Sequence, residues 1–127
     1  MGLVHADIKL DNPKGGVAAV STQALVDTGA LHLCIPESVS RQLNLSAERV
    51  RRVTFADGRS MEAPYVGPIR VEVAGRTCFV GAMVFGEEVL LGAIPMEDLD
   101  LVIDPAPQQV VPRDRGTTSL AKRSRAA

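Results

Sequence analysis

Asp27, Thr28 and Gly29 follow directly on an apolar run at residues 24–26, and Ala30 comes next. An aspartate at the end of a buried strand, in a turn that contains glycine, carries its carboxylate out of the core on a rigid support. A catalytic acid must be held in this way. Asp and Gly also favour ordinary turns, so a plain strand end is the competing interpretation of these residues. The rest of the chain has to decide between the two.

Other residues that could do chemistry are few. The two cysteines and two histidines include no closely spaced pair of metal ligands, which argues against a zinc site. Cys34 and Cys78 each lie among apolar residues, so we expect buried, reduced and inert thiols. His32 alternates with two leucines and is expected to face outward, as is His5. No glycine-rich segment has phosphate-binding spacing, and we predict neither a metal nor a cofactor.

Composition limits the function classes. A chain of 127 residues with 46% hydrophobic content has the size of one compact domain. Its 14 basic and 15 acidic side chains give a net charge of -1, which argues against nucleic acid and anionic membrane surfaces as partners. No apolar run has the length that a bilayer requires, and the first residues lack the pattern of a secretion signal. We therefore expect a soluble, cytoplasmic protein.

The hydrophobic pattern predicts an all-β domain over residues 1–112, with two short helices, and a disordered tail over 113–127. Gly67 and Pro68 are expected to end a strand, and Glu97 and Asp98 to lie favourably near the start of the second helix. Helices are expected at 36–44 and 95–101, and strands at 4–10, 17–26, 31–35, 50–56, 59–66, 69–73, 77–85, 89–92, 102–104 and 110–112.

Asp57 and Gly58 separate two of these strands. An Asp-Gly pair between strands is among the strongest signals for a two-residue hairpin turn, in which both central residues have positive φ. The sequence therefore predicts a protruding hairpin with these two residues at its tip.

The motifs and their order resemble the retropepsin-like aspartic proteases, the single-lobe relatives of pepsin, and within them the microbial cytoplasmic branch. The residues that carry the resemblance are Leu25 to Ala30, Ile35 to Glu37, Leu90 to Gly92 and the segment 96–105. The resemblance implies a closed β-barrel with one lobe per chain, in which the strand at 90–92 crosses beneath the Asp27 turn. A glycine at position 92 would then permit close approach of two backbones.

Peptide hydrolysis by carboxylates needs one ionised group to take a proton from water and one protonated group to donate to the substrate carbonyl. Aspartic proteases use two carboxyl groups about 3 Å apart that share one proton. This chain has a single Asp-Thr-Gly and is too short for a second lobe. The second carboxylate is therefore expected from another copy, in a homodimer whose two-fold axis passes between two Asp27 side chains.

The resemblance also implies roles for the neighbouring residues. Thr28 would turn its hydroxyl across the two-fold axis, and Gly29 and Ala30 would contact an extended peptide or protein substrate. The hairpin with Asp57, Gly58 and Arg59 would be a flap over the substrate. Its tip is polar, unlike the glycine-rich tips of retroviral flaps, and a solvent-exposed hairpin without substrate contact is an equal alternative. A dimer that binds peptides without cutting them is the second candidate function, because fold alone does not confer activity.

Overall fold

The computed structural model describes residues 3–54 and 57–113. The chain is mostly β, and six strands close into a barrel, as the sequence predicts. The strands are β1 (His5–Asp11), β2 (Val20–Val26), β3 (Leu33–Ile35), β4 (Ala47–Thr54), β5 (Ser60–Val73), β6 (Arg76–Val84), β7 (Val89–Leu91), β8 (Leu101–Asp104) and β9 (Gln109–Pro112), and the helices are α1 (Glu37–Gln42) and α2 (Ala93–Asp98).

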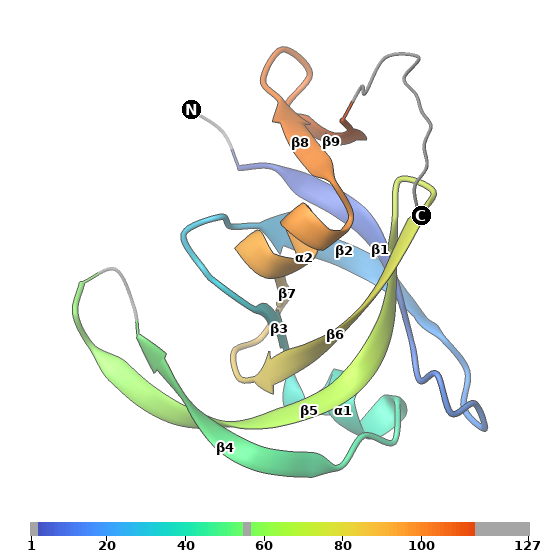
Figure 1. Cartoon of the computed structure of the whole chain (residues 1–127), viewed down its shortest axis with the longest axis vertical. Helices are drawn as coiled ribbons and strands as arrows, with labels where there is room; N and C mark the ends of the chain where they lie inside the picture. The colour runs from blue at the N-terminus through green and yellow to red at the C-terminus, as the bar shows by residue number, and fades with distance from the viewer. Residues whose placement is uncertain (1–2, 55–56, 114–127) are drawn as a thin grey trace, which may run out of the picture.

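The barrel closes because β5 pairs with β1 as well as with β6 (Figure 1). The strand order is β1-β2-β7-β3-β6-β5, and β4 adds to the outer edge of β5. In β1, Ala6, Ile8 and Leu10 are buried and the residues between them are exposed, so each strand contributes one face to a common interior. This interior is an apolar core that includes residues of β2 and β7, and a smaller second cluster is formed by Cys34, Ala63 and Met83.

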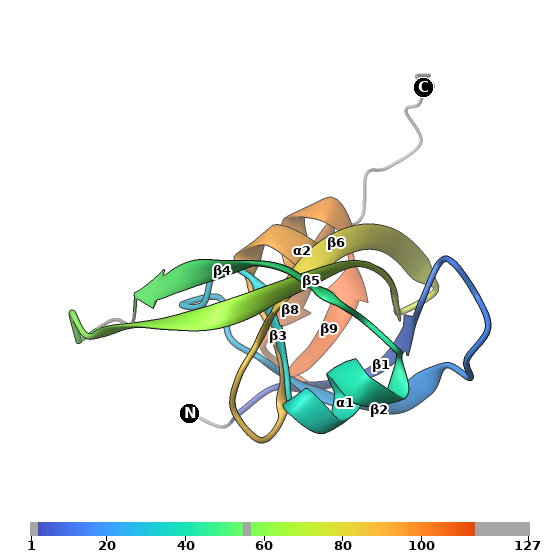
Figure 2. The ribbon, with the colours of Figure 1, turned by 90° about the horizontal axis from the view of Figure 1, so that it is seen from below.

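β5 is longer than the barrel wall, and its first half pairs with β4 to form an arm that projects from the barrel (Figures 1 and 2). Gly67 and Pro68 lie inside β5, so the predicted strand break there is wrong. The pairing of β5 with β6 shifts in register between Val66 and Ile69. Because residues in a bulge do not all take part in the ladder of hydrogen bonds, a proline is tolerated at this point.

The tip of the arm is a hairpin, but the predicted two-residue turn is wrong. Thr54 and Ser60 are the last paired residues, so the connection is longer, and its residues 55–56 lie outside the described residues. Gly58 has a φ of 88°. The Asp57 carboxylate accepts the Arg59 N–H at 3.0 Å and the Arg59 Nε–H at 2.7 Å. A side-chain hydrogen bond to the backbone two residues further on is typical of aspartate in turns.

Both helices differ from the predicted ranges. α1 is shorter, and Asn44 adopts a φ of 54° just beyond it, in keeping with the predicted helix end. α2 begins at Ala93 rather than at Pro95, which is accommodated because a proline in the first helical turn displaces no intrahelical N–H bond. Glu97 and Asp98 consequently lie in the last turn, so their predicted favourable position at the helix start is wrong.

A separate two-stranded sheet of β8 and β9 follows α2. Arg76, the first residue of β6, anchors it by donating to the carbonyl oxygens of Leu99 (3.2 Å) and Asp100 (3.0 Å). Arg113 donates through Nε to Asp100 Oδ1 at 2.8 Å. Arg113 is thus bound to the hairpin, and the remainder of the predicted tail, from residue 114, lies outside the described residues.

Arg76→Ala should lower the free energy of unfolding by about 2 kcal/mol, because it leaves two partly buried carbonyl groups without their charged donor and removes one of the cations next to the Asp100 carboxylate. The side chain of Asp100 is only 17% exposed, so water replaces the lost contacts poorly. Urea denaturation of both proteins measures the difference. Arg70→Ala is the matched control, since its 3.6 Å contact with Glu72 is more exposed and should contribute little. Equal losses in the two variants would contradict this role of Arg76.

Candidate functional site

Backbone hydrogen bonds hold the Asp27 turn in place, and a hydrogen bond from Gly29 orients the Asp27 carboxylate. The Asp27 N–H donates to the Leu91 carbonyl oxygen at 3.0 Å, which continues the parallel pairing of β2 with β7. The Ala30 N–H donates back to the Asp27 carbonyl oxygen at 3.0 Å and closes the turn. The Gly29 N–H donates to Asp27 Oδ1 at 3.0 Å. The carboxylate therefore has a defined orientation at the end of a core strand.

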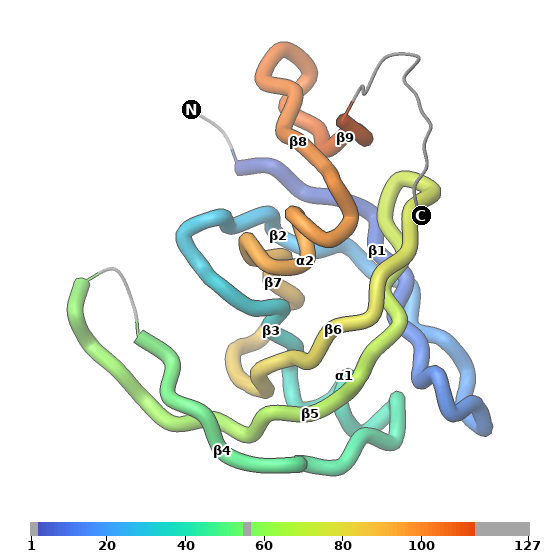
Figure 3. Tube along the Cα trace, in the orientation of Figure 1, coloured from blue at the N-terminus to red at the C-terminus, as the bar shows by residue number. Residues whose placement is uncertain are grey.

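Gly92 allows the chain after β7 to pass directly against this loop (Figure 3). A Cβ at position 92 would collide with the carbonyl oxygen of His32 and lie 2.8 Å from that of Ala30. The first two N–H groups of α2, from Ala93 and Ile94, donate to the carbonyl oxygens of Ala30 and Leu31, each at 2.9 Å. The predicted close approach of two backbones at Gly92 is confirmed.

A cleft of about 440 Å³ lies in front of Asp27, between its loop and the arm. Its surface is largely apolar, and Asp27 is the one carboxylate among the described residues that line it. Asp27 itself is exposed. The lining residues are Asp27, Gly29, Ala30, Leu31, His32, Cys34, Arg52, Val53, Thr54, Met83, Phe85 and Leu90.

The structure brings some of the predicted site residues together and separates others. Asp27, Gly29 and Ala30 line the cleft. Thr28 lines a different hollow, next to α2 and β8. Asp57, Gly58 and Arg59 lie at the tip of the arm and are not among the described residues that line the cleft. Their predicted contact with substrate stays a prediction.

The arm contributes to the cleft through Arg52, Val53 and Thr54, which sequence reasoning did not single out. Their position next to a predicted protruding hairpin was the available signal. The alternation of β4 alone could not identify them, because it does not say which part of the arm faces the Asp27 loop.

The predicted outward orientation of His32 is wrong, since His32 lines the cleft. β3 begins only at Leu33, so the alternation does not extend to the two residues before it, and Leu31 is the exposed one at 60%. The imidazole and the Tyr65 ring form a T-shaped contact, with 5.9 Å between the ring centroids. Burial, and secondly the positive charge of Arg51, lower the pKa of His32 from its ordinary value of 6.5.

This lowered pKa predicts a pH-dependent stability. Below pH 6.5 the unfolded chain takes up a proton at His32 more readily than the folded protein, so stability falls as the pH falls through this window. His32→Gln should reduce that loss, which thermal midpoints measured from about pH 7.5 to about pH 5 would reveal. His5→Gln, in an exposed position of β1, is the control. Parallel pH profiles of wild type and His32→Gln would refute the prediction.

Cys34 and Cys78 are free and buried, as predicted. Burial raises the pKa of each thiol to about 11, and a nearby negative charge adds to this, that of Asp27 for Cys34 and that of Asp98 for Cys78. A thiol with so high a pKa is a poor nucleophile at neutral pH, which argues against such a role for Cys34 although it lines the cleft. In the described parts of the chain, no cluster of three or more His, Cys, Asp and Glu side chains could hold a metal ion.

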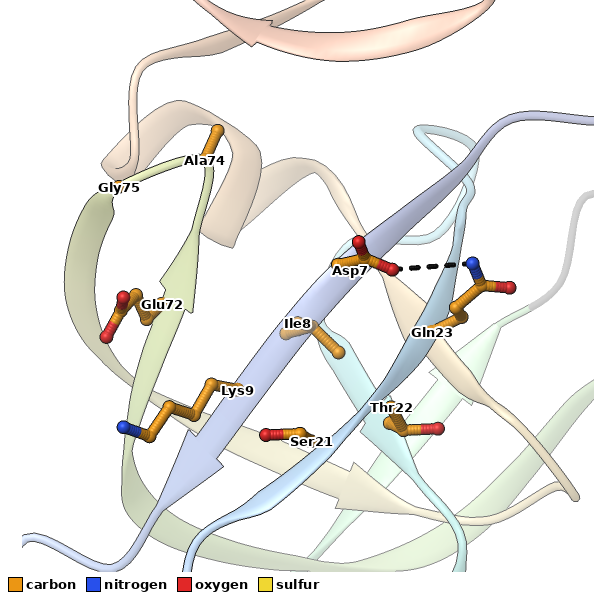
Figure 4. Close-up of a pocket in the computed structure, with 9 residues that line it drawn as sticks. All are labelled: Asp7, Ile8, Lys9, Ser21, Thr22, Gln23, Glu72, Ala74 and Gly75. Atoms are coloured by element: carbon orange, nitrogen blue, oxygen red, sulfur yellow. Dashed lines mark hydrogen bonds between the residues drawn. The ribbon is translucent and has the colours of Figure 1, made fainter.

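A second and larger hollow, of about 730 Å³, lies over β1, β2 and the end of β5 (Figure 4). The Gln23 side chain donates to Asp7 at 3.4 Å, and Figure 4 shows the head groups of Lys9 and Glu72 away from this pair. This hollow shares no lining residue with the Asp27 cleft. Its side chains carry both signs of charge, and Gln23 to Asp7 is the side-chain hydrogen bond described among them. The Asp27 cleft has an exposed carboxylate at the end of a core strand and is the candidate site. Among residues 3–54 and 57–113, no helix is long and apolar enough to cross a membrane.

Comparison with known families gives a result that agrees with this geometry. A family model described as aspartyl protease matches residues 14–93. The matched region contains the Asp27 turn, the arm and the crossing at Gly92. A search of curated proteins gave no match.

Proposed function

Because the chain belongs to the aspartyl protease family, we propose that it is an aspartic endopeptidase, active as a homodimer in which each protomer contributes Asp27. The two carboxylates would activate one water molecule for attack on a peptide bond. The two buried free thiols agree with a reducing, cytoplasmic setting, which is part of the proposal.

One observation carries this proposal: the cleft contains a single carboxylate among its described lining residues, and that carboxylate is exposed at the end of a rigid strand. The reaction requires an acid and a base at once. A second copy related by a two-fold axis near Asp27 would supply the missing carboxyl group and cover the exposed one.

In the proposed dimer, two carboxyl groups about 3 Å apart hold one proton between them, since both cannot be ionised at that distance. The ionised Asp27 takes a proton from water, and the protonated Asp27 donates to the carbonyl oxygen of the substrate. Gly29 keeps the carboxylate oriented through its N–H. Thr28, which does not line the cleft, remains available for a hydrogen bond across the axis.

The substrate in this proposal is an extended peptide. The apolar lining, which includes Leu31, Met83 and Leu90, suits large apolar side chains next to the scissile bond. The arm would close over the peptide as a flap, with Asp57, Gly58 and Arg59 at its tip and Val53 nearer the catalytic turn.

Cleavage of a mixed peptide library by the wild type and by Asp27→Asn under identical conditions tests the proposal. Cleavage by the wild type alone is the expected result, and it also reveals the side-chain preference. Two folded, dimeric proteins that both fail to cleave, or that cleave equally, would reject it. Peptide binding without cleavage would identify the alternative function, a non-catalytic binding dimer.

A further inference from the structure

Three arginines of β4 lack a carboxylate partner within the described residues. Arg49, Arg51 and Arg52 form no ion pair there, although Arg52 donates through Nη1 to Ser60 Oγ at 3.4 Å. The other described arginines all have one, namely Arg41, Arg59, Arg70, Arg76 and Arg113. Glu62 lies opposite Arg52 in the register of β4 with β5, whereas Arg51 lies opposite Ala63 and Arg49 opposite Tyr65.

Two of these arginines are held in place by Tyr65. The guanidinium carbon of Arg51 lies 4.4 Å from the centroid of the Tyr65 ring, and that of Arg49 lies 5.6 Å from it. Contacts of a guanidinium with an aromatic face restrict its orientation while leaving its N–H donors free. The ring itself is fixed, because it packs against Gly81, where any Cβ would collide with it.

The cationic group formed by Arg49 and Arg51 adjoins the cleft. His32 lines the cleft and touches the same Tyr65 ring. Arg52 also lines the cleft, but successive side chains of a strand point to opposite faces, so it lies on the other face of β4 from Arg51. Arg51 and Tyr65 thus form, with His32, a wall that runs from the cleft onto β4. A peptide that lies along the cleft and pairs with the arm would bring its flanking side chains to this wall.

We propose that Arg51, supported by Arg49 on the same face of β4, forms a subsite for an acidic side chain of the substrate, a few residues from the scissile bond. This inference rests on the proposed endopeptidase function and adds a substrate class: peptides with apolar residues at the cut and Glu or Asp in a flanking position. Carboxylates pair well with the planar donor face of arginine, and the open cleft edge admits them.

Single-stranded nucleic acid would also be attracted by three arginines and a tyrosine. The observations favour a peptide for two reasons. The cationic group is small and continuous with the Asp27 cleft, and the chain as a whole carries a net charge of -1, which gives no extended field for a polyanion.

The test starts from a library peptide with a single cut. Glu or Gln is placed in turn at each of several positions on both sides of the cut, and kcat/KM is measured at low ionic strength. We expect Glu to be preferred over Gln by about threefold to fivefold at a position on one side, the size of an exposed charge pair. High salt should reduce the preference. No preference for Glu at any position would overturn the inference.

Substitutions assign the preference to Arg51. Arg51→Gln should bring the Glu-to-Gln ratio close to one, and Arg51→Glu should favour Lys in the same position. Arg51→Lys keeps the charge and should keep most of the preference, which guards against an effect of lost packing on Tyr65. Arg41→Gln is the matched control, because this exposed arginine lies on α1 and pairs with Glu37. An unchanged ratio in both Arg51→Gln and Arg51→Glu would overturn the assignment.

Binding to Asp27→Asn separates this inference from the endopeptidase proposal. Tighter binding of the Glu peptide than of the Gln peptide, with no cleavage by the wild type, would retain the acidic subsite and reject the activity. Cleavage without a Glu preference would do the reverse. Binding of a single-stranded oligonucleotide that depends on Arg51, with no effect of Arg51 on peptides, would also reject the acidic subsite.

Discussion

Asp27→Asn should lower kcat/KM for peptide hydrolysis by about 10³-fold to 10⁴-fold, the scale on which positioned acid and base groups contribute. The substitution keeps the shape of the side chain, and the amide oxygen can still accept the Gly29 N–H that now binds Oδ1. Folding should therefore change little. The loss reports the missing proton transfer and not a damaged turn.

The matched control is Asp7→Asn. It removes the same charge from an exposed position of β1 that does not line the Asp27 cleft. It should retain wild-type activity. Thermal denaturation of all three proteins checks that each is folded. Residual activity of Asp27→Asn comparable to that of Asp7→Asn would show that Asp27 is not the catalytic acid.

Mixing the wild type with Asp27→Asn extends this prediction to the dimer. If each active centre needs two Asp27 side chains and protomers exchange freely, an equimolar mixture should show about half the activity per wild-type chain, because half of those chains sit in mixed dimers. Activity per wild-type chain that does not depend on the added variant would instead indicate a centre complete in one protomer.

Gly92→Ala is the second change for which we expect a large effect, a loss of roughly 3 kcal/mol in the free energy of unfolding. The added Cβ would meet backbone atoms of residues 30–32, which cannot rotate away as a side chain could. The φ of Gly92 is -87°, so backbone strain at position 92 does not contribute. A shift of the chain at Gly92 would also displace the Asp27 turn. We therefore expect a lower peptidase activity even for the molecules that remain folded.

Gly75→Ala provides the contrast. Gly75 has a φ of 77° but open space around its Cα, so its replacement costs only the strain of a left-handed residue, about 1 kcal/mol. Urea denaturation compares the two. A smaller loss for Gly92→Ala than for Gly75→Ala would mean that the loop beneath Asp27 yields easily and is not a rigid support.

The barrel was predictable because the hydrophobic pattern of its strands is visible in the local sequence. The alternation in β1 and the apolar segment before Asp27 report burial directly, and the Gly92 crossing followed from the family resemblance. Pro68 and Pro95 misled the prediction, since a proline is compatible with a bulge and with a first helical turn as well as with a break. Local sequence does not distinguish these cases.

The site was predictable at Asp27 and much less so around it. The contact of Arg51 with Tyr65 depends on the register of β4 against β5, which pairs Arg49 with Tyr65 and places Arg51 two residues further along the same face. The position of His32 depends on where β3 begins. The register of β4 against β5 and the first residue of β3 are both set by tertiary packing, and neither can be deduced from a single sequence.

The hydrogen bonds that fix the Asp27 loop come from Leu91, Ala93 and Ile94, far along the chain. During synthesis from the N-terminus, the aspartate leaves the ribosome long before the residues that hold it. The nascent chain therefore carries an unanchored aspartate until β7 and α2 have emerged and packed. If a second copy must then join, the reactive centre is the last part of the molecule to form, and the emerging polypeptides around it are not exposed to a completed protease.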